Sequence, residues 1–240
     1  MKKLKLFIYP VLFIFFISCS QTRKEGSDAE QDHESGSSEG HSHDMADHDH
    51  DASEISASAS ISWMPAGTGE ESIKSDFHFL SGSLENIKPV VIQDDRGTKI
   101  LELTADGTPT SFVFHSKYSN VGLSASIKKV DFTGKIELIH HAKSPSNYEF
   151  VSIENSTMQL GRVIDGEQIV LDKAEFEQPV QDWTILKASA AGSHYKGYIG
   201  DNNVTHGHAD EMEDGYVGIM LIGSGKIQIS SIELLSLEDE

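Results

Sequence analysis

Hydrophobic and polar residues alternate in short runs along the chain from about residue 61 onward. β-Branched and aromatic residues fill these runs, and Gly, Asn, Asp or Pro bound them, which is the pattern of half-buried β-strands. No window predicts a long amphipathic helix, and the best candidate, residues 210–214, is about one turn. The expected strands are 88–93, 99–104, 110–115, 121–130, 135–141, 148–153, 158–164, 167–172, 184–190, 194–199, 216–222 and 226–235.

The residues between these runs are turn-formers. Asp165-Gly166 predicts a hairpin, and Gly223-Ser224-Gly225 predicts a second turn, because glycine and aspartate supply positive φ or local side-chain hydrogen bonds. Within 226–235 the apolar residues change from one face of the strand to the other, which predicts a β-bulge near Ser230-Ser231. Many short strands at regular spacing predict an all-β fold, an antiparallel sandwich or barrel.

The first residues have a different pattern. A lysine-rich start precedes an apolar run over 6–17, which is too short to span a bilayer, and Ser18 then precedes Cys19. This order predicts a signal peptide over 1–18, and its end resembles a bacterial lipobox, whose cysteine is diacylated. That resemblance implies a lipid-anchored protein of the bacterial cell envelope, with the outer membrane as the expected location. An ordinary signal peptide that happens to contain this cysteine is the alternative.

Residues 19–57 contain almost no large apolar side chains, so we expect a disordered, acidic tether there. Its histidines alternate with aspartates, and imidazole is a ligand for Zn²⁺, Cu²⁺ and Ni²⁺. The candidate metal ligands are His41, His43, His48 and His50. The alternative is a solvated low-complexity segment that binds metal only incidentally.

Composition narrows the choice of partner. The formal net charge of −19 argues against nucleic acid, whose phosphates require a basic protein surface. Cys19 is the single cysteine of the chain, so no internal disulfide can form. The segment 58–240 is long enough for one domain with a sizeable core, which must be stabilised by burial and backbone pairing.

Several motifs occur in a familiar order in that domain. They include Ser146-Asn147-Tyr148-Glu149, Val163-Ile164-Asp165-Gly166, Asp182-Trp183-Thr184 and Asp214-Gly215-Tyr216-Val217-Gly218. This succession resembles the concanavalin A-like jelly roll of bacterial glycan-active proteins, in particular the 3-keto-disaccharide hydrolase domain and its laminin-G-like relatives, over roughly 110–237. The resemblance implies a two-sheet antiparallel jelly-roll sandwich and a glycan ligand.

The chain departs from that group where the enzymes carry their aromatic-rich Gly-Trp opening and their Tyr-Glu strand, so no catalytic residue is assigned. Glu137 and Glu149 remain as acids that could face each other across adjacent strands, at the separation of about 5 Å that a retaining glycosidase needs. The sequence leans against an enzyme. A metal-dependent glycoside-cleaving enzyme and a histidine-rich metal-binding protein of the envelope are the alternatives to a glycan- or ligand-binding module.

Aromatic and imidazole side chains on strands are the candidate ligand-binding residues, because a ring on a sheet face can stack against a sugar. They are His140, Tyr148, His194 and Tyr198, and ordinary sandwich packing is the alternative for each. His140 and His141 are adjacent, so in a regular strand they point to opposite faces and cannot bind one metal together.

A second candidate metal site lies in 205–211, which we expect to be a loop before the penultimate strand. His206, His208 and Asp210 could converge there on one divalent cation, with Ca²⁺ and Zn²⁺ both open. An exposed polar loop without a metal is the alternative. The sequence requires no other cofactor.

Overall fold

The structure is a computed structural model, and it describes residues 57–177 and 183–237, with side chains from Ser60 onward. Over these residues the chain is an all-β sandwich of the jelly-roll type, as expected, with fourteen antiparallel strands and two short helices. Among the described residues, no helix combines the length and the apolar character that crossing a membrane requires. The elements are β1 (Ala57–Trp63), α1 (Gly69–Lys74), β2 (Phe77–Ser81), α2 (Leu84–Ile87), β3 (Val90–Gln93), β4 (Lys99–Asp106), β5 (Thr110–Tyr118), β6 (Val121–Lys129), β7 (Thr133–Ser144), β8 (Asn147–Glu154), β9 (Thr157–Ile164), β10 (Glu167–Glu175), β11 (Thr184–Ala191), β12 (His194–Ile199), β13 (Asn202–His208) and β14 (Gly215–Leu237).

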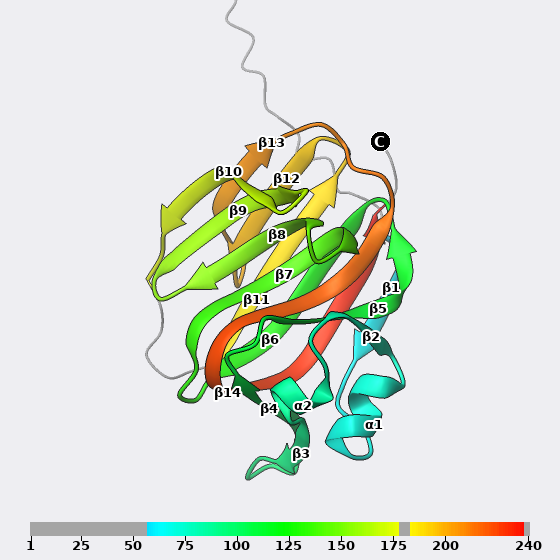
Figure 1. Cartoon of the computed structure of the whole chain (residues 1–240), viewed down its shortest axis with the longest axis vertical. Coiled ribbons are helices and arrows are strands. Elements are labelled where there is room, and N and C mark those ends of the chain that lie inside the picture. The colour runs from blue at the N-terminus through cyan, green and yellow to red at the C-terminus, as the bar shows by residue number, and fades with distance from the viewer. Residues whose placement is uncertain (1–56, 178–182, 238–240) are drawn as a thin grey trace, which may run out of the picture. The chain divides into compact units, whose positions relative to one another are not determined.

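Two sheets lie face to face and share β14 (Figure 1). The first sheet has the order β10-β9-β8-β7-β14-β5-β2 and uses the first half of β14. The second has the order β13-β12-β11-β6-β14 and uses the second half, with β4 and β1 on the other side of β14 and β3 outside β4. Strands β9 and β10 of the first sheet meet β12 and β13 of the second, so β12 and β13 lie at one edge of the sandwich.

The long strand β14 corrects the sequence reading of Gly223-Ser224-Gly225. These residues do not form a turn, because the strand continues through them and changes partner instead. Gly223 has a φ of 153° and pairs with Gly134 of β7, and a Cβ added to Gly223 would lie 2.2 Å from the Thr133 carbonyl oxygen. The glycines therefore bend one strand from sheet to sheet. The bulge expected near Ser230-Ser231 is confirmed as a register shift between Ile229 and Ser231.

Several elements were not expected from the sequence, namely β1, β2, β13 and the two helices. The most consequential is β13, because it replaces the loop expected over 205–211 up to His208. Residues 210–214 form no helix. Helix α1 begins with a capping box, in which the Thr68 hydroxyl accepts a bond from the Glu71 amide and the Glu71 carboxylate accepts one from the Thr68 amide.

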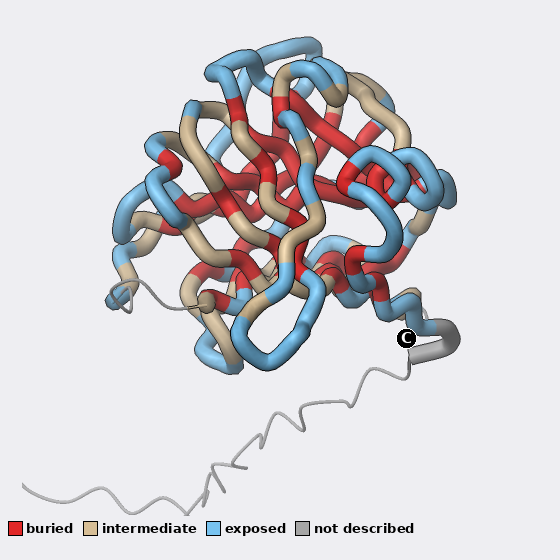
Figure 2. Tube along the Cα trace, turned by 90° about the horizontal axis from the view of Figure 1, so that it is seen from below, coloured by how far each residue is buried: buried red, intermediate tan, exposed pale blue. Residues whose placement is uncertain are grey.

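The core fills the space between the sheets (Figure 2). Leu138 and Val151 of the first sheet and Leu186 and Ile232 of the second are among its fully buried members. A second, smaller buried cluster contains Ile139, Phe150 and Met220. Each of these neighbours a core residue in its strand, so this cluster covers the outer face of the first sheet. The outer face of the second sheet is different, since small and polar side chains dominate it.

Candidate functional site

The outer face of the second sheet carries a row of polar side chains around one aromatic ring. Register pairs Glu233 of β14 with Ser124 of β6, Ser124 with Lys187 of β11, and Lys187 with Tyr198 of β12. Residues paired in register across neighbouring strands point to the same face, so the four side chains form one line across the sheet. A ring, a hydroxyl, an ammonium and a carboxylate therefore lie side by side.

This row lies in an open groove of about 320 Å³. Lys187 Nζ is 2.8 Å from Asp201 Oδ1, which places a second carboxylate at the end of the row. Partial burial raises the pKa of Tyr198, so its hydroxyl stays protonated and can donate or accept a hydrogen bond. The lining residues are Gly122, Leu123, Ser124, Lys187, Ala188, Ser189, Tyr198, Asp201, Glu233, Leu235 and Leu237.

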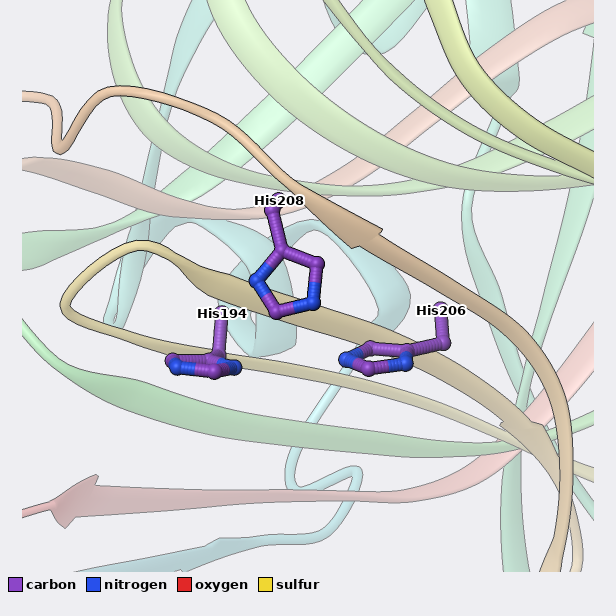
Figure 3. A group of neighbouring side chains, drawn as sticks. All are labelled: His194, His206 and His208. Atoms are coloured by element: carbon purple, nitrogen blue, oxygen red, sulfur yellow. The ribbon is translucent and has the colours of Figure 1, made fainter.

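Three histidines gather on the same face, at the β12–β13 edge. We call His194, His206 and His208 the histidine trio (Figure 3). All three are exposed, and one nitrogen from each ring lies within 4.8 Å of the others. The His194 and His206 rings are nearly parallel, with centroids 6.3 Å apart, and His208 lies 4.5 Å from the first and 4.7 Å from the second.

Strand register brings the histidine trio together. His194 pairs with His208, and His206 pairs with Lys196. His206 and His208 are two residues apart on β13 and so share a face, as do His194, Lys196 and Tyr198 on β12. The trio and the groove therefore occupy one surface, with His194 about 13 Å along the strand from Tyr198 at about 3.3 Å per residue.

Several neighbours act on the pKa of His206. Partial desolvation lowers the pKa of His206, and His208 and Lys196 lower it further. Asp172 of β10 acts in the opposite sense, and its Oδ2 accepts a 2.9 Å hydrogen bond from the His206 main-chain amide. A neutral imidazole offers a nitrogen lone pair, which is the form that ligates a metal.

The sequence grouped these residues differently. It placed His206 and His208 with Asp210, and His194 with Tyr198, whereas the structure joins His194 to His206 and His208. Asp210 is exposed and lies beyond the end of β13; its main-chain oxygen accepts bonds from Arg162 at 2.8 Å and from the Tyr195 hydroxyl at 3.4 Å. Its carboxylate is not part of the trio.

A second group of histidines is buried between the sheets. His140, His141 and Glu149 lie close together, and Arg162 completes what we call the buried network. His141 Nδ1 is 2.7 Å from Glu149 Oε2 and 3.1 Å from His140 Nδ1, and an Arg162 nitrogen donates to Glu149 Oε1 at 2.5 Å. The ring of His140 stacks on that of Tyr195, with centroids 6.0 Å apart.

The expectation that His140 and His141 point to opposite faces was wrong. It assumed a regular strand, but His141 has a φ of 48°, and the β7–β8 register shifts between His140 and Ser144. This irregularity turns both rings toward Glu149. Histidine is among the residue types that adopt positive φ more often, but sequence gives no sign of which histidine does so.

Glu149 is the carboxylate of the buried network, and it faces two cationic groups, Arg162 and His141. His141 Nε2 donates to the Ser119 carbonyl and Nδ1 to Glu149, so both ring nitrogens face acceptors and the ring is cationic. Burial alone would lower the pKa of His141, but Glu149 and the Ser119 carbonyl raise it above its usual value. Burial alone would raise the pKa of Glu149, but the two histidines hold it at about 2.

The other predicted ligand-binding residues are divided between interior and surface. His140 is 0% exposed and Tyr148 is 5% exposed, so neither offers a ring face to solvent. The Tyr148 hydroxyl donates to Glu137 Oε2 at 3.2 Å. Glu137 bonds Tyr148 on one face of the first sheet while Glu149 belongs to the buried network on the other, so the two acids do not form a glycosidase pair.

The remaining predicted residues lie outside the described part of the chain. They are the signal peptide, the lipidation site Cys19, and the tether histidines His41, His43, His48 and His50. Their roles stay predictions. The first described strand begins at Ala57, beside the expected domain boundary.

Comparison with known proteins confirms the fold. No protein-family model matches the chain, and no curated protein sequence matches it. A carbohydrate-binding module, CBM66 from Bacillus subtilis, superposes with a TM-score of 0.54 at 16% identity, covering 67% of this chain and 96% of the module. A Bacillus subtilis protein of unknown function with a galectin-like fold gives 0.58 at 10% identity, covering 78% and 100% of the two chains. A β-glucanase from Bacillus licheniformis gives 0.50 at 10% identity, covering 74% and 98%.

These likenesses establish a concanavalin A-like, galectin-like jelly roll, as the sequence motifs implied. At 10–16% identity they establish the fold alone.

Proposed function

We propose that the chain is a lipid-anchored protein of the bacterial envelope whose jelly roll binds glycan in the groove on the outer face of the second sheet. The observation that carries this proposal is the row Tyr198–Lys187–Ser124–Glu233, in which one ring stands beside three polar groups. A sugar presents an apolar ring face and a rim of hydroxyls, and such a row complements both.

Small residues leave room for a sugar beside the ring. Gly122 and Ser189 pair with each other in the row next to Ser124 and Lys187, so small residues line the middle of the groove, and Leu235, which pairs with Gly122, flanks them. The fold likeness to a carbohydrate-binding module adds support. The two acids that the sequence offered for glycoside cleavage, Glu137 and Glu149, add no support for it, because they lie on opposite faces of the first sheet. We therefore propose binding rather than hydrolysis.

A glycan-array screen of the mature chain, followed by titration with the best ligand, tests this proposal. Tyr198→Ala removes the stacking surface and is expected to weaken binding about tenfold or more, since ring–ligand stacking contributes about 1–3 kcal/mol. Tyr198→Phe keeps the ring and is expected to lose less. Tyr216→Ala, a partly buried tyrosine of the first sheet, is the control and leaves binding unchanged. Absence of any array signal, or equal binding by Tyr198→Ala, contradicts the proposal.

The proposed anchor has its own test. Cys19→Ala removes the only thiol that can carry the acyl chains, so the protein is expected to move from the membrane to the soluble fraction and to lose incorporation of labelled fatty acid. Membrane association that survives this substitution contradicts lipid anchoring. The outer membrane is the proposed location, and density-gradient separation of the two membranes tests it.

A further inference from the structure

We propose that the histidine trio is a surface site for a borderline divalent transition metal, with Zn²⁺ as the probe ion. His194, His206 and His208 would supply three imidazole nitrogens, and a fourth position would stay open to water or to an added ligand. This inference rests on the trio alone and does not depend on glycan binding in the groove.

The geometry is close to that of a bound site. Around a tetrahedral Zn²⁺ with Zn–N distances of 2.0–2.1 Å, two ligand nitrogens are about 3.4 Å apart. The nearest nitrogens of the trio already lie within 4.8 Å of one another. The rings are exposed, so small χ rotations can close the remaining distance without moving the backbone.

The backbone fixes the relative positions of the three histidines. His194 and His208 are a directly paired cross-strand couple, and His206 shares the face of His208 two residues away. The bond from the His206 amide to Asp172 ties β13 to β10 of the other sheet. The ligands thus stand on strands at fixed register, and binding orders only side chains, which costs less entropy than wrapping a flexible peptide around the ion.

The donor set selects the class of ion. Three imidazole nitrogens suit Zn²⁺, Cu²⁺ and Ni²⁺, whereas Ca²⁺ and Mg²⁺ require oxygen ligands. The trio contains no carboxylate, so of the two ions left open by the sequence the structure favours zinc over calcium. The formal net charge of −19 favours the approach of any cation.

Lys196 allows a further test of metal binding at the trio. Its ammonium lies on the same face as His206, with which it is paired in register, and it acts on the charge of that ring. A bound dication feels the same repulsion, so Lys196→Gln is expected to raise metal affinity a few-fold at low ionic strength. A purely structural role for the three histidines predicts no such gain.

The test is calorimetric titration of Zn²⁺ into the full mature chain in which His33, His41, His43, His48 and His50 are replaced by Ser, so that the tether cannot bind the ion. One equivalent is expected to bind in this background. His206→Gln and His194→Gln are each expected to weaken that binding about tenfold or more, because a three-ligand site loses one donor. His115→Gln disrupts the other exposed histidine pair, in which His115 Nδ1 lies 3.2 Å from His78 Nδ1; as the matched control it is expected to leave the binding unchanged.

Two further measurements make the assignment specific. Cu²⁺ bound to the same background is expected to show electron paramagnetic resonance couplings from three nitrogens, reduced by one in His206→Gln. Circular dichroism checks that each variant is folded, which is expected because all three side chains are exposed. Equal Zn²⁺ affinity in His206→Gln, His194→Gln and His115→Gln overturns the proposal, and so does the absence of Zn²⁺ binding in the folded background chain.

Discussion

The histidine trio and the buried network both consist largely of histidines, but they differ in exposure and in hydrogen bonding. Each brings three potential metal ligands within 4.8 Å, but the trio is exposed whereas His140, His141 and Glu149 are buried. In the network Glu149 Oε1 accepts a hydrogen bond from Arg162 and Oε2 lies 2.7 Å from His141 Nδ1, whereas His140 Nε2 and Arg162 Nε have no hydrogen-bond partner. In the trio Lys196 is the one cation placed opposite a ring, and it lies at the surface, where it can swing away.

The comparison shows that a cluster of ligands becomes a candidate metal site only if its lone pairs are free. A guanidinium and an imidazolium already satisfy Glu149, so a dication would have to displace them inside a low-dielectric core. The exposed imidazoles have no such partners to lose. The trio is therefore a candidate for metal binding, and the network is a candidate for stabilising the fold. Substitutions in each group are expected to separate these two roles.

The largest effect is expected at Glu149. Glu149→Gln removes the charge that pairs with Arg162 and His141, which leaves two buried cations opposed to each other. We expect the free energy of unfolding to fall by about 3–5 kcal/mol, measured by urea denaturation. Glu154→Gln, at the exposed end of the same strand, is the control and is expected to change it by less than about 0.5 kcal/mol. A wild-type stability for Glu149→Gln would contradict the network.

Zinc is expected to stabilise the fold by a somewhat smaller amount. At a free Zn²⁺ concentration of 100 times Kd, binding to the folded state alone adds about 2.7 kcal/mol, visible as a rise in Tm of several degrees. The sequence predicts a disordered tether, and histidines on such a segment bind the folded and unfolded chains alike, so replacing the tether histidines is expected to preserve the rise. His206→Gln, with its weaker binding, is expected to reduce the rise to about half or less at the same Zn²⁺ concentration, and a rise that follows the tether histidines instead would contradict the trio.

One substitution in each histidine site tests the two roles side by side. His141→Gln removes the donor of Glu149 Oε2 and of the Ser119 carbonyl, and it is expected to cost about 1–3 kcal/mol of stability while zinc binding persists. His206→Gln is expected to weaken zinc binding about tenfold or more while stability changes by less than about 0.5 kcal/mol. Denaturation and zinc titration of both variants measure the two effects, and loss of zinc binding in His141→Gln would reverse the assignment.

The smallest effect is a pH dependence of the buried network. The pKa of His141 is raised above 6.5 in the folded chain, so its contribution to stability is complete below pH 6.5 and is lost as the pH rises through the folded-state value. Glu149 and Asp214 favour this charge, and His140, whose own pKa is lowered by burial, stays neutral beside it.

We therefore expect the stability difference between wild type and His141→Gln to shrink as the pH rises above 6.5 and through the raised pKa of His141, measured by denaturation at a series of pH values. His194→Gln, at an exposed site, is expected to show no such trend. A difference that grows with pH would mean that His141 is not the cation of the network.

The alternating strands were predictable from sequence, because burial of one face imposes a period of two. Among the strands that the sequence did not predict, β13 is informative. It was taken for a loop because Asn202–His208 contains one large apolar residue, Val204, and the strand pairs along one edge only. The glycines of β14 were misread for a related reason, since glycine serves equally in a turn and in a bend under close backbone contact.

The candidate site was only half predictable. His206 and His208 were recognisable as ligands from their spacing, but their partner depends on the pairing of β12 with β13, which residue patterns do not fix. Tyr198 lies half-buried on the outer face of the second sheet, whereas His140 and Tyr148 alternate like surface residues and are buried nonetheless. His140 faces the space between the sheets and Tyr148 belongs to the apolar cluster on the outer face of the first sheet, and no single-strand pattern reveals either position.

We propose that the outer face of the second sheet is the binding face of this jelly roll and that its histidine trio holds the metal. The most direct measurement is anomalous diffraction at the zinc absorption edge from crystals of the mature chain grown with Zn²⁺. We predict a peak among His194, His206 and His208, within about 2.0–2.1 Å of a nitrogen of each. A zinc peak beside His140, His141 and Glu149, or no peak at the trio, would contradict the claim.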